Sequence, residues 1–196
     1  MWQIEKDMLN EGFTTVCGVD EAGRGPLAGP VYAAAVILPF GIEIPDLNDS
    51  KKLTEKNREL LFSIITEKAI SYSIASATHE EVDELNILGA TYVAMNRAIE
   101  ALSIKPSIAL IDGNRNSAIT INSRCIIGGD GKSASIAAAS ILAKVSRDKH
   151  MLEMAAKYPQ YAFDKHKGYG TKLHYEKLRE HGLSEIHRLT FLKGLK

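Results

Sequence analysis

One short stretch, residues 14–31, constrains this chain more than any other part of it. It contains four glycines, two prolines, one arginine and the adjacent acids Asp20 and Glu21, between two apolar runs. The first run reads as a buried strand, which we expect to end at Asp20 because glycine and proline interrupt regular structure. Neighbouring side chains of a strand point to opposite faces, so two acids serve one point only where the strand ends or bulges. We therefore interpret the stretch as a catalytic strand end, with a solvated acidic turn as the alternative.

The composition indicates one globular domain. The chain has 196 residues, of which 45% are hydrophobic, and this suffices for one good-sized core. No run approaches the roughly 18 apolar residues of a membrane span, and residues 1–13 are too charged for a signal peptide. We expect a cytoplasmic monomer without membrane contact. Cys17 and Cys125 lie in apolar runs, which favours buried thiols over a disulfide or a zinc site.

Charge is distributed unevenly along a chain that is neutral overall. Residues 1–130 contain 11 Lys and Arg against 18 Asp and Glu, whereas residues 131–196 contain 13 against 6, a net charge of +7. Such a split suits an acidic chemical centre served by a basic surface that grips a polyanion. A solvated basic helix explains the charge equally well.

The periodicity of apolar residues predicts an α/β fold. Strands are expected at residues 14–20, 31–38, 71–78, 107–112 and 119–127, the first two as an antiparallel pair. Helices are expected after Thr54, with Leu60 among the residues of its apolar face, at residues 79–102, at residues 133–157, and up to His181. We expect the second helix to be broken near Asn86 or Gly89, and the last to be closed by Gly182.

Four acids lie at the ends of three expected strands. They are Asp20, Glu21, Asp112 and Asp130. In α/β folds, functional sites lie at the ends of strands, so these carboxylates can converge from segments that are far apart in the sequence. Clustered carboxylates raise one another's pKa and repel anions unless a cation joins them, and all-oxygen ligands suit Mg²⁺ or Mn²⁺. Two such ions about 4 Å apart could activate water on one side of a phosphodiester and steady the leaving oxygen on the other.

Two nucleotide-binding motifs are approached but not matched. Glycines at 23, 25 and 29 miss the dinucleotide-binding spacing by one residue. The sequence of residues 131–133 resembles a phosphate loop, but Ile126 stands where that motif requires glycine. Neither class of protein is favoured.

Three further residues are candidates for phosphate contacts. Lys51 stands in a lysine pair just before a helix, where a solvated turn is an equal alternative. Ser140 and Lys144 lie one helical turn apart, a spacing that could suggest a catalytic dyad. Phosphate contact or ordinary helix packing is the simpler interpretation.

Taken together, several segments resemble the bacterial ribonuclease HII family, the type 2 ribonucleases H. They are residues 20–26 (DEAGRGP), 49–53 (DSKKL), 111–113 (IDG), 129–130 (GD), 135–145 (SIAAASILAKV), 147–148 (RD) and 166–171 (HKGYGT). The resemblance implies a ribonuclease H-like α/β fold, with a five-stranded mixed sheet flanked by helices and a C-terminal helical extension. We expect one domain, residues 1–196, with residues 1–158 as its core and residues 159–196 as a substrate-binding extension.

The resemblance also implies an activity and a set of site residues. Members of the family cleave the RNA strand of RNA/DNA hybrids, and cleave 5′ to single ribonucleotides in duplex DNA, leaving 3′-hydroxyl and 5′-phosphate ends. By position, the metal-binding catalytic set would be Asp20, Glu21, Asp112 and Asp130. The loop Gly23, Arg24 and Gly25 would read the ribose 2′-hydroxyl, the chemical difference between RNA and DNA. Tyr169 would stack on the neighbouring deoxyribose, and Lys51, Ser140 and Lys144 would contact phosphates.

Departures from related families narrow the prediction. Type 3 ribonucleases H carry a sizeable N-terminal domain, for which about a dozen residues are available here, so type 2 is favoured. The tail at residues 189–194 lacks the glutamine-led motif by which some relatives bind a sliding clamp, so we do not predict that partner. The alternatives are a hybrid-binding module without catalysis, and another nuclease or resolvase of the same fold.

Overall fold

The computed structural model describes residues 1–47 and 53–194 and contains one central sheet. Its strands are β1 (Val16–Ala22), β2 (Val31–Ile37), β3 (Ser71–Ala77), β4 (Ile108–Asp112) and β5 (Ser123–Ile126). They lie in the order β3-β2-β1-β4-β5. Strand β1 pairs antiparallel with β2 and parallel with β4, so the predicted five-stranded mixed sheet is confirmed.

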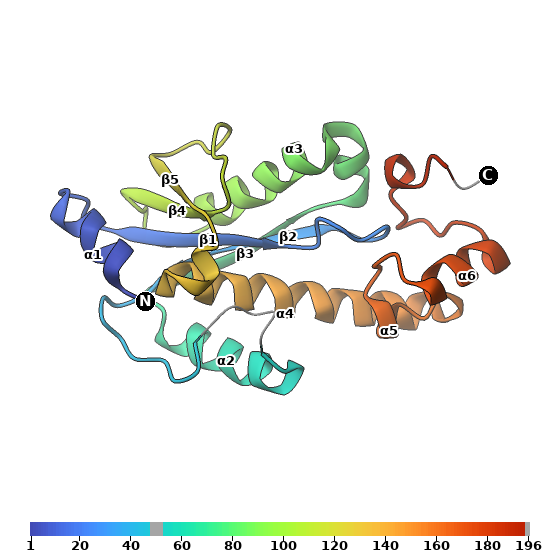
Figure 1. Ribbon diagram of the computed structural model, residues 1–196, viewed down its shortest axis with the longest axis horizontal. Coiled ribbons are helices and arrows are strands. Elements are labelled where there is room, and N and C mark those ends of the chain that lie inside the picture. The colour runs from blue at the N-terminus through green and yellow to red at the C-terminus, as the bar shows by residue number, and fades with distance from the viewer. Residues whose placement is uncertain (48–52, 195–196) are drawn as a thin grey trace.

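Helices cover both faces of the sheet. They are α1 (Gln3–Asn10), α2 (Glu55–Lys68), α3 (His79–Glu100), α4 (Ala134–Lys157), α5 (Phe163–His166) and α6 (Lys172–His181), with short 3-10 helices η2 (Gly129–Gly131), η3 (Pro159–Tyr161) and η4 (Leu189–Phe191). Helix α3 lies on one face, α2 and α4 on the other, and α5 and α6 lie beyond one end of the sheet (Figure 1). Thr54, Thr78, Ser133 and Thr171 cap the four longer helices after α1 through their hydroxyl oxygens.

Two apolar layers hold the sheet between these helices. Buried residues of α3 pack with one face of β1 and β2, and the alanine-rich α4 packs on the other face. Gly18 of β1 makes the second contact possible, because a Cβ there would lie 2.1 Å from the carbonyl carbon of Ser135. Helix α4 therefore lies directly on the strand that carries Asp20. None of the described helices is long and apolar enough to cross a membrane.

Several predicted boundaries are correct and others are wrong. Helix α4 and the closure of α6 at Gly182 agree with prediction, and α3 is bent at Asn86, whose φ is +60°. Strand β5 is shorter than the predicted residues 119–127, and Leu60, predicted to face the core, is 62% exposed. Helix α1 was not anticipated. Its Glu5 is buried and accepts hydrogen bonds from the Ser133 hydroxyl (2.6 Å) and the Ser135 amide (3.0 Å) at the start of α4.

Candidate active site

Asp20 and Glu21 lie on opposite faces of β1. The prediction that the strand ends at Asp20 is wrong. The antiparallel partner β2 continues to pair with β1 beyond that residue: Glu21 is opposite Ala33 and Ala22 is opposite Tyr32. Side chains therefore alternate through both acids. Asp20 points to α4, where the Ser140 hydroxyl bonds it, whereas Glu21 borders a cavity on the side of α3.

The Asp20 carboxyl is in an environment that opposes its charge. It is only 5% exposed. Burial raises its pKa well above the usual range, and the negative charges of Glu21 and Asp112 add to the rise. The hydrogen bond from the Glu21 amide (2.7 Å) and the Ser140 contact act in the opposite direction and do not cancel it. The site thus holds negative charge that lacks full compensation within the protein.

Asp112 and Asp130 are linked through the turn that follows β5. An Asp112 oxygen accepts the amide of Gly129 at 2.7 Å, and Asp130 is the next residue, buried in η2. The structure thus brings Asp20, Glu21 and Asp112 within electrostatic reach, and places Asp130 next to a residue bonded to Asp112. Within residues 1–47 and 53–194, no three acidic, histidine or cysteine side chains form a ready-made metal-ligand group.

A cavity of about 240 Å³ joins the first two acids to the predicted substrate-binding residues. Its walls include Asp20, Glu21, the loop residues Gly23, Arg24 and Gly25, and also Ser140, Lys144 and Tyr169. Lys144 also forms an ion pair with Asp148 at 2.8 Å, and Ser140 bonds Asp20, so each of the two side chains contacts an acid. Lys51 lies outside the described residues.

The loop after β1 is held from below by Arg188, which is completely buried. Its guanidinium donates to the main-chain oxygens of Gly23 (2.6 Å), Arg24 (3.0 Å), Pro26 (2.8 Å) and Gly29 (2.9 Å). In the described part of the chain, the amides of Gly23, Arg24 and Gly25 have no hydrogen-bond partner. Loop carbonyls are therefore occupied by the protein, while amides remain for a ligand.

A second buried arginine, Arg147, supports the loop and Tyr169 together. It donates to the main-chain oxygens of Ala28 (3.3 Å), Pro30 (3.3 Å) and Lys167 (3.0 Å). Its guanidinium carbon lies 5.6 Å from the centre of the Tyr169 ring. Gly23, with a φ of +100°, also makes room for it, since a Cβ there would lie 2.1 Å from the Arg147 Nε. Sequence reasoning gave neither buried arginine a role.

Three buried histidines lie beneath Tyr169, and two of them form a directed chain. The Ser184 amide donates to His187 Nδ1 (2.8 Å), so His187 carries its proton on Nε2 and donates to His174 Nε2 (3.0 Å). His174 then donates from Nδ1 to the Tyr169 carbonyl oxygen (2.9 Å). His166 stacks on His174, with ring centres 4.2 Å apart. The chain fixes the main chain that carries Tyr169.

We expect this histidine chain to make the fold sensitive to acid. Burial lowers the pKa of His174 and of His187 from 6.5 to about 4, with a further contribution from the charge of His166. Below pH 6.5 the unfolded chain takes up protons that the folded chain refuses, so stability falls as the pH drops toward 4. The loss is on the order of 3 kcal/mol for one such histidine. Urea unfolding at pH 7 and pH 4.5 measures it.

A variant separates this effect from the titration of carboxylates. His187→Asn removes one titrating ring, and we expect it to lose less stability than the wild type over the same pH interval. His181→Asn, at the exposed end of α6, is the matched control and should change the pH dependence less than His187→Asn does. Equal pH dependence in all three proteins would contradict the prediction.

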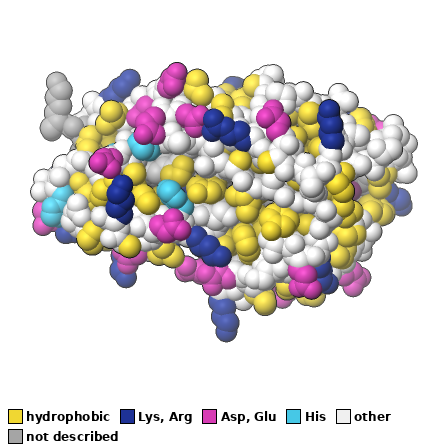
Figure 2. Space-filling view, turned by 180° about the vertical axis from the view of Figure 1, so that it is seen from behind, with side chains coloured by type: hydrophobic (Ala, Val, Ile, Leu, Met, Phe, Trp, Pro, Cys, Tyr) yellow, Lys and Arg dark blue, Asp and Glu magenta, His cyan; other side chains and the backbone are white. Residues whose placement is uncertain are grey.

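The basic excess of residues 131–196 does not form one continuous basic surface on the face seen in Figure 2. Lysine and arginine side chains alternate there with acids. Several lysines of this part form ion pairs, including Lys157 with Glu185 and Lys177 with Glu180. The basic side chains that border the candidate site are Arg24 and Lys144 in the loop cavity, and Arg24 and Arg115 in the cavity beside α3.

Comparison with known proteins decides the family. A model of the family described as Ribonuclease HII matches residues 17–193. The chain belongs to the ribonuclease HII family. A curated ribonuclease HII of Endomicrobium trichonymphae is 58% identical over 192 residues, which are 97% of this chain and 91% of that protein. The chain is therefore a hydrolase of the nuclease class.

Solved structures of ribonucleases H share the fold. The crystal structure of the ribonuclease H2 from Pyrococcus horikoshii OT3 matches with a TM-score of 0.75 and 28% identity, over 90% of this chain and 93% of that one. The structure of Bst-RNase HIII in complex with Mn²⁺ matches with a TM-score of 0.67 and 18% identity, over 90% of this chain and 67% of that one. The ribonuclease H-like fold expected from the sequence is confirmed.

Proposed function

We propose that the chain is a metal-dependent endoribonuclease that cleaves 5′ to single ribonucleotides in duplex DNA and cleaves the RNA strand of RNA/DNA hybrids. The products would carry 3′-hydroxyl and 5′-phosphate ends. One observation carries the proposal: acids, a loop with free amides and Tyr169 border a single cavity. The acids, the loop and Tyr169 can then contact one phosphate, its ribose and the neighbouring sugar of the same strand.

The donor set fits divalent cations. Asp20 has a raised pKa because negative neighbours and burial oppose its charge, and a bound cation would relieve both. We propose that Asp20, Glu21, Asp112 and Asp130 hold Mg²⁺ or Mn²⁺, as a pair of ions. Bound there, the cations would supply an activated water and neutralise charge on the phosphate. A carboxylate has two oxygens, so Asp112 can keep its bond to the Gly129 amide and Glu21 its ion pair with Arg24 while each contacts a cation.

Recognition of the ribose would fall to the loop after β1. The amides of Gly23, Arg24 and Gly25, which have no partner among the described residues, offer donors, and the absence of side chains at two of these positions lets a sugar approach the main chain. A ribose 2′-hydroxyl accepts such hydrogen bonds, whereas a deoxyribose has no oxygen at that position. Because Arg188 holds the loop carbonyls, the amides are already oriented before a substrate arrives.

The test is a nicking assay with metal removed and restored. Purified protein and Mg²⁺ should cut a duplex containing one ribonucleotide on the 5′ side of that residue. Activity should vanish with chelator and return with Mg²⁺ or Mn²⁺. All-DNA and all-RNA duplexes serve as controls that separate this activity from that of other nucleases of the fold. Binding without a cut under any metal or pH would instead identify a hybrid-binding module.

Tyr169→Ala should weaken cleavage at single ribonucleotides more than it weakens folding. The ring is 41% exposed, so its removal leaves no large cavity, while stacking on a nucleotide contributes about 1–3 kcal/mol. We expect a fall of about tenfold or more in kcat/KM on the single-ribonucleotide duplex. Tyr169→Phe, which keeps the ring, is the matched control and should retain most activity. Equal activity of the alanine variant and the wild type would refute the role.

A further inference from the structure

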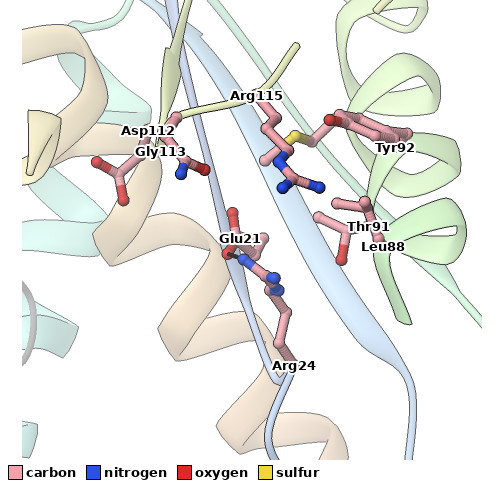
Figure 3. Close-up of a pocket in the computed structure, with 10 residues that line it drawn as sticks. Glu21, Arg24, Leu88, Thr91, Tyr92, Asp112, Gly113 and Arg115 are labelled. Atoms are coloured by element: carbon pink, nitrogen blue, oxygen red, sulfur yellow. Dashed lines mark hydrogen bonds and ion pairs between the residues drawn. The ribbon is translucent and has the colours of Figure 1, made fainter. Parts of the chain in front are cut away.

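A second cavity adjoins the carboxylates on the side of α3. It has a volume of about 270 Å³ and lies between the ends of β1 and β4 and the helix (Figure 3). Its polar lining includes Glu21, Arg24, Tyr92, Asp112 and Arg115. It shares Glu21 and Arg24 with the cavity that contains Tyr169, so the two hollows lie on either side of one acid and one arginine. The resemblance to the family assigned no residue on the α3 side of it.

The Tyr92 hydroxyl is the feature of this cavity that points to a ligand. The side chain is 7% exposed, and its oxygen has no hydrogen-bond partner among the described residues. Buried hydroxyls are almost always bonded, because an unpartnered one costs stability. Figure 3 shows its hydroxyl end directed from α3 toward Arg115. The hydroxyl is thus a donor placed toward the cavity without an acceptor.

Arg115 supplies a positive charge beside the Tyr92 hydroxyl. It is exposed, follows the turn after β4, and forms no ion pair or hydrogen bond in the part of the chain that the structure describes. Arg24 lies across the cavity, paired with Glu21 at 3.2 Å. Two guanidiniums and a hydroxyl present donors suited to phosphate oxygens. Glu21 and Asp112 oppose an anion there, so a free phosphate is disfavoured relative to one carried into place by a bound strand.

We propose that this cavity binds a backbone phosphate of the cleaved strand, 5′ to the scissile one, through Arg115 and the Tyr92 hydroxyl. The inference rests on the proposed function. A ribonucleotide read at Gly23–Gly25, with its 3′ neighbour on Tyr169, presents its 5′ phosphate to the carboxylates. The strand then continues past Glu21 into the α3-side cavity. Tyr92 and Arg115 are thereby positioning residues for the upstream part of the strand.

Binding measured without divalent cations tests Arg115 apart from catalysis. A fluorescent duplex with one ribonucleotide is titrated at several salt concentrations. Arg115→Gln should reduce the slope of log K against log salt by about 0.9, the amount expected for one lost phosphate contact. Arg124→Gln removes an equal charge that is paired with Glu11 at 2.8 Å, and should leave the slope unchanged. An unchanged slope for Arg115→Gln would overturn the proposal.

Tyr92→Phe separates binding from packing. Because the hydroxyl has no partner in the protein, its removal should leave the melting temperature unchanged or higher. A lost hydrogen bond to a charged phosphate should weaken duplex affinity about tenfold, seen in KM with kcat retained. A lower melting temperature with unchanged affinity would show that the hydroxyl serves the fold and would overturn its assignment.

Neutral phosphates locate the contact on the strand. A methylphosphonate is placed in turn at each of the first three phosphates 5′ of the scissile bond. At one position it should weaken binding by the wild type and have no further effect on Arg115→Gln. Equal losses in both proteins at every position would overturn the inference. The salt titration and the methylphosphonate series measure binding alone, so a protein that binds as described and cuts nothing would refute the proposed function separately.

Discussion

Asp20→Asn should lower kcat by about 10²–10³-fold while making the protein more stable. The wild-type carboxyl is buried, and its raised pKa means that the folded state disfavours its charge near neutral pH. Asparagine keeps an oxygen for the Glu21 amide and removes the charge, so metal-free protein should melt at a higher temperature. Loss of one catalytic electrostatic group typically costs about 10²–10³-fold in kcat. Melting curves and the nicking assay measure the two effects on one sample.

Activity should fall while stability rises, and this combination distinguishes a catalytic residue from one that serves only the fold. A residue that mattered only for folding would lose activity and stability together. Asp7→Asn, the same change on the exposed side of α1, should alter neither. Retained cleavage by Asp20→Asn would remove the residue from the catalytic set, whatever its effect on melting.

Arg188→Met should cost about 4 kcal/mol or more of folding stability, the largest stability effect that we expect from one substitution. The change leaves four carbonyl oxygens without donors, three of them in buried bonds, and each hydrogen bond from a charged donor contributes about 1.5–3 kcal/mol. Burial lowers the pKa of Arg188 to about 9, which still leaves the guanidinium charged at neutral pH. Urea unfolding gives the free energy.

Lysine and a surface arginine provide the comparisons. Arg188→Lys keeps the charge, but an ammonium has three donors on one point and cannot reach four separated oxygens, so it should rescue little. Arg179→Met, on the exposed face of α6, removes the same groups where nothing is buried and should change stability by less than about 0.5 kcal/mol. Full rescue by lysine would contradict the account of the loop.

The fold was predictable where the local sequence pattern agrees with the packing and strand pairing of the folded chain. Helix α4 and the bend at Asn86 follow from apolar spacing, a cap and a turn-forming residue. The end of β1 was not predictable from local sequence, because pairing of Ala22 with Tyr32 outweighs the glycines that follow. Leu60 satisfies the helical pattern of α2 and still faces solvent, since the pattern cannot say which of several apolar neighbours meets the sheet.

The site was predictable as a set of residues and not as an arrangement. Acids after strands indicated Asp20, Glu21 and Asp112, which the structure brings within electrostatic reach. Their metal-binding role stays a prediction. Arg147 lies in a segment that resembles the family, but the sequence indicated no role for it or for Arg188, because a buried arginine bonded to main chain leaves no pattern in the sequence of its partners.

The pairing of the loop with the far end of the chain decides when, during synthesis, the loop can be held in its folded position. Residues 27–29 pair with residues 186–188 through Gly29 to Ile186, Arg188 to Leu27, and a bridge between Ala28 and His187. A chain emerging from the ribosome assembles its sheet from the N-terminus onward. The loop after β1 nevertheless lacks its four hydrogen bonds from Arg188 until that residue has been synthesised. A chain that ends before residue 186 therefore keeps the sequence of β1 and its acids but lacks the contacts that hold the loop beside them.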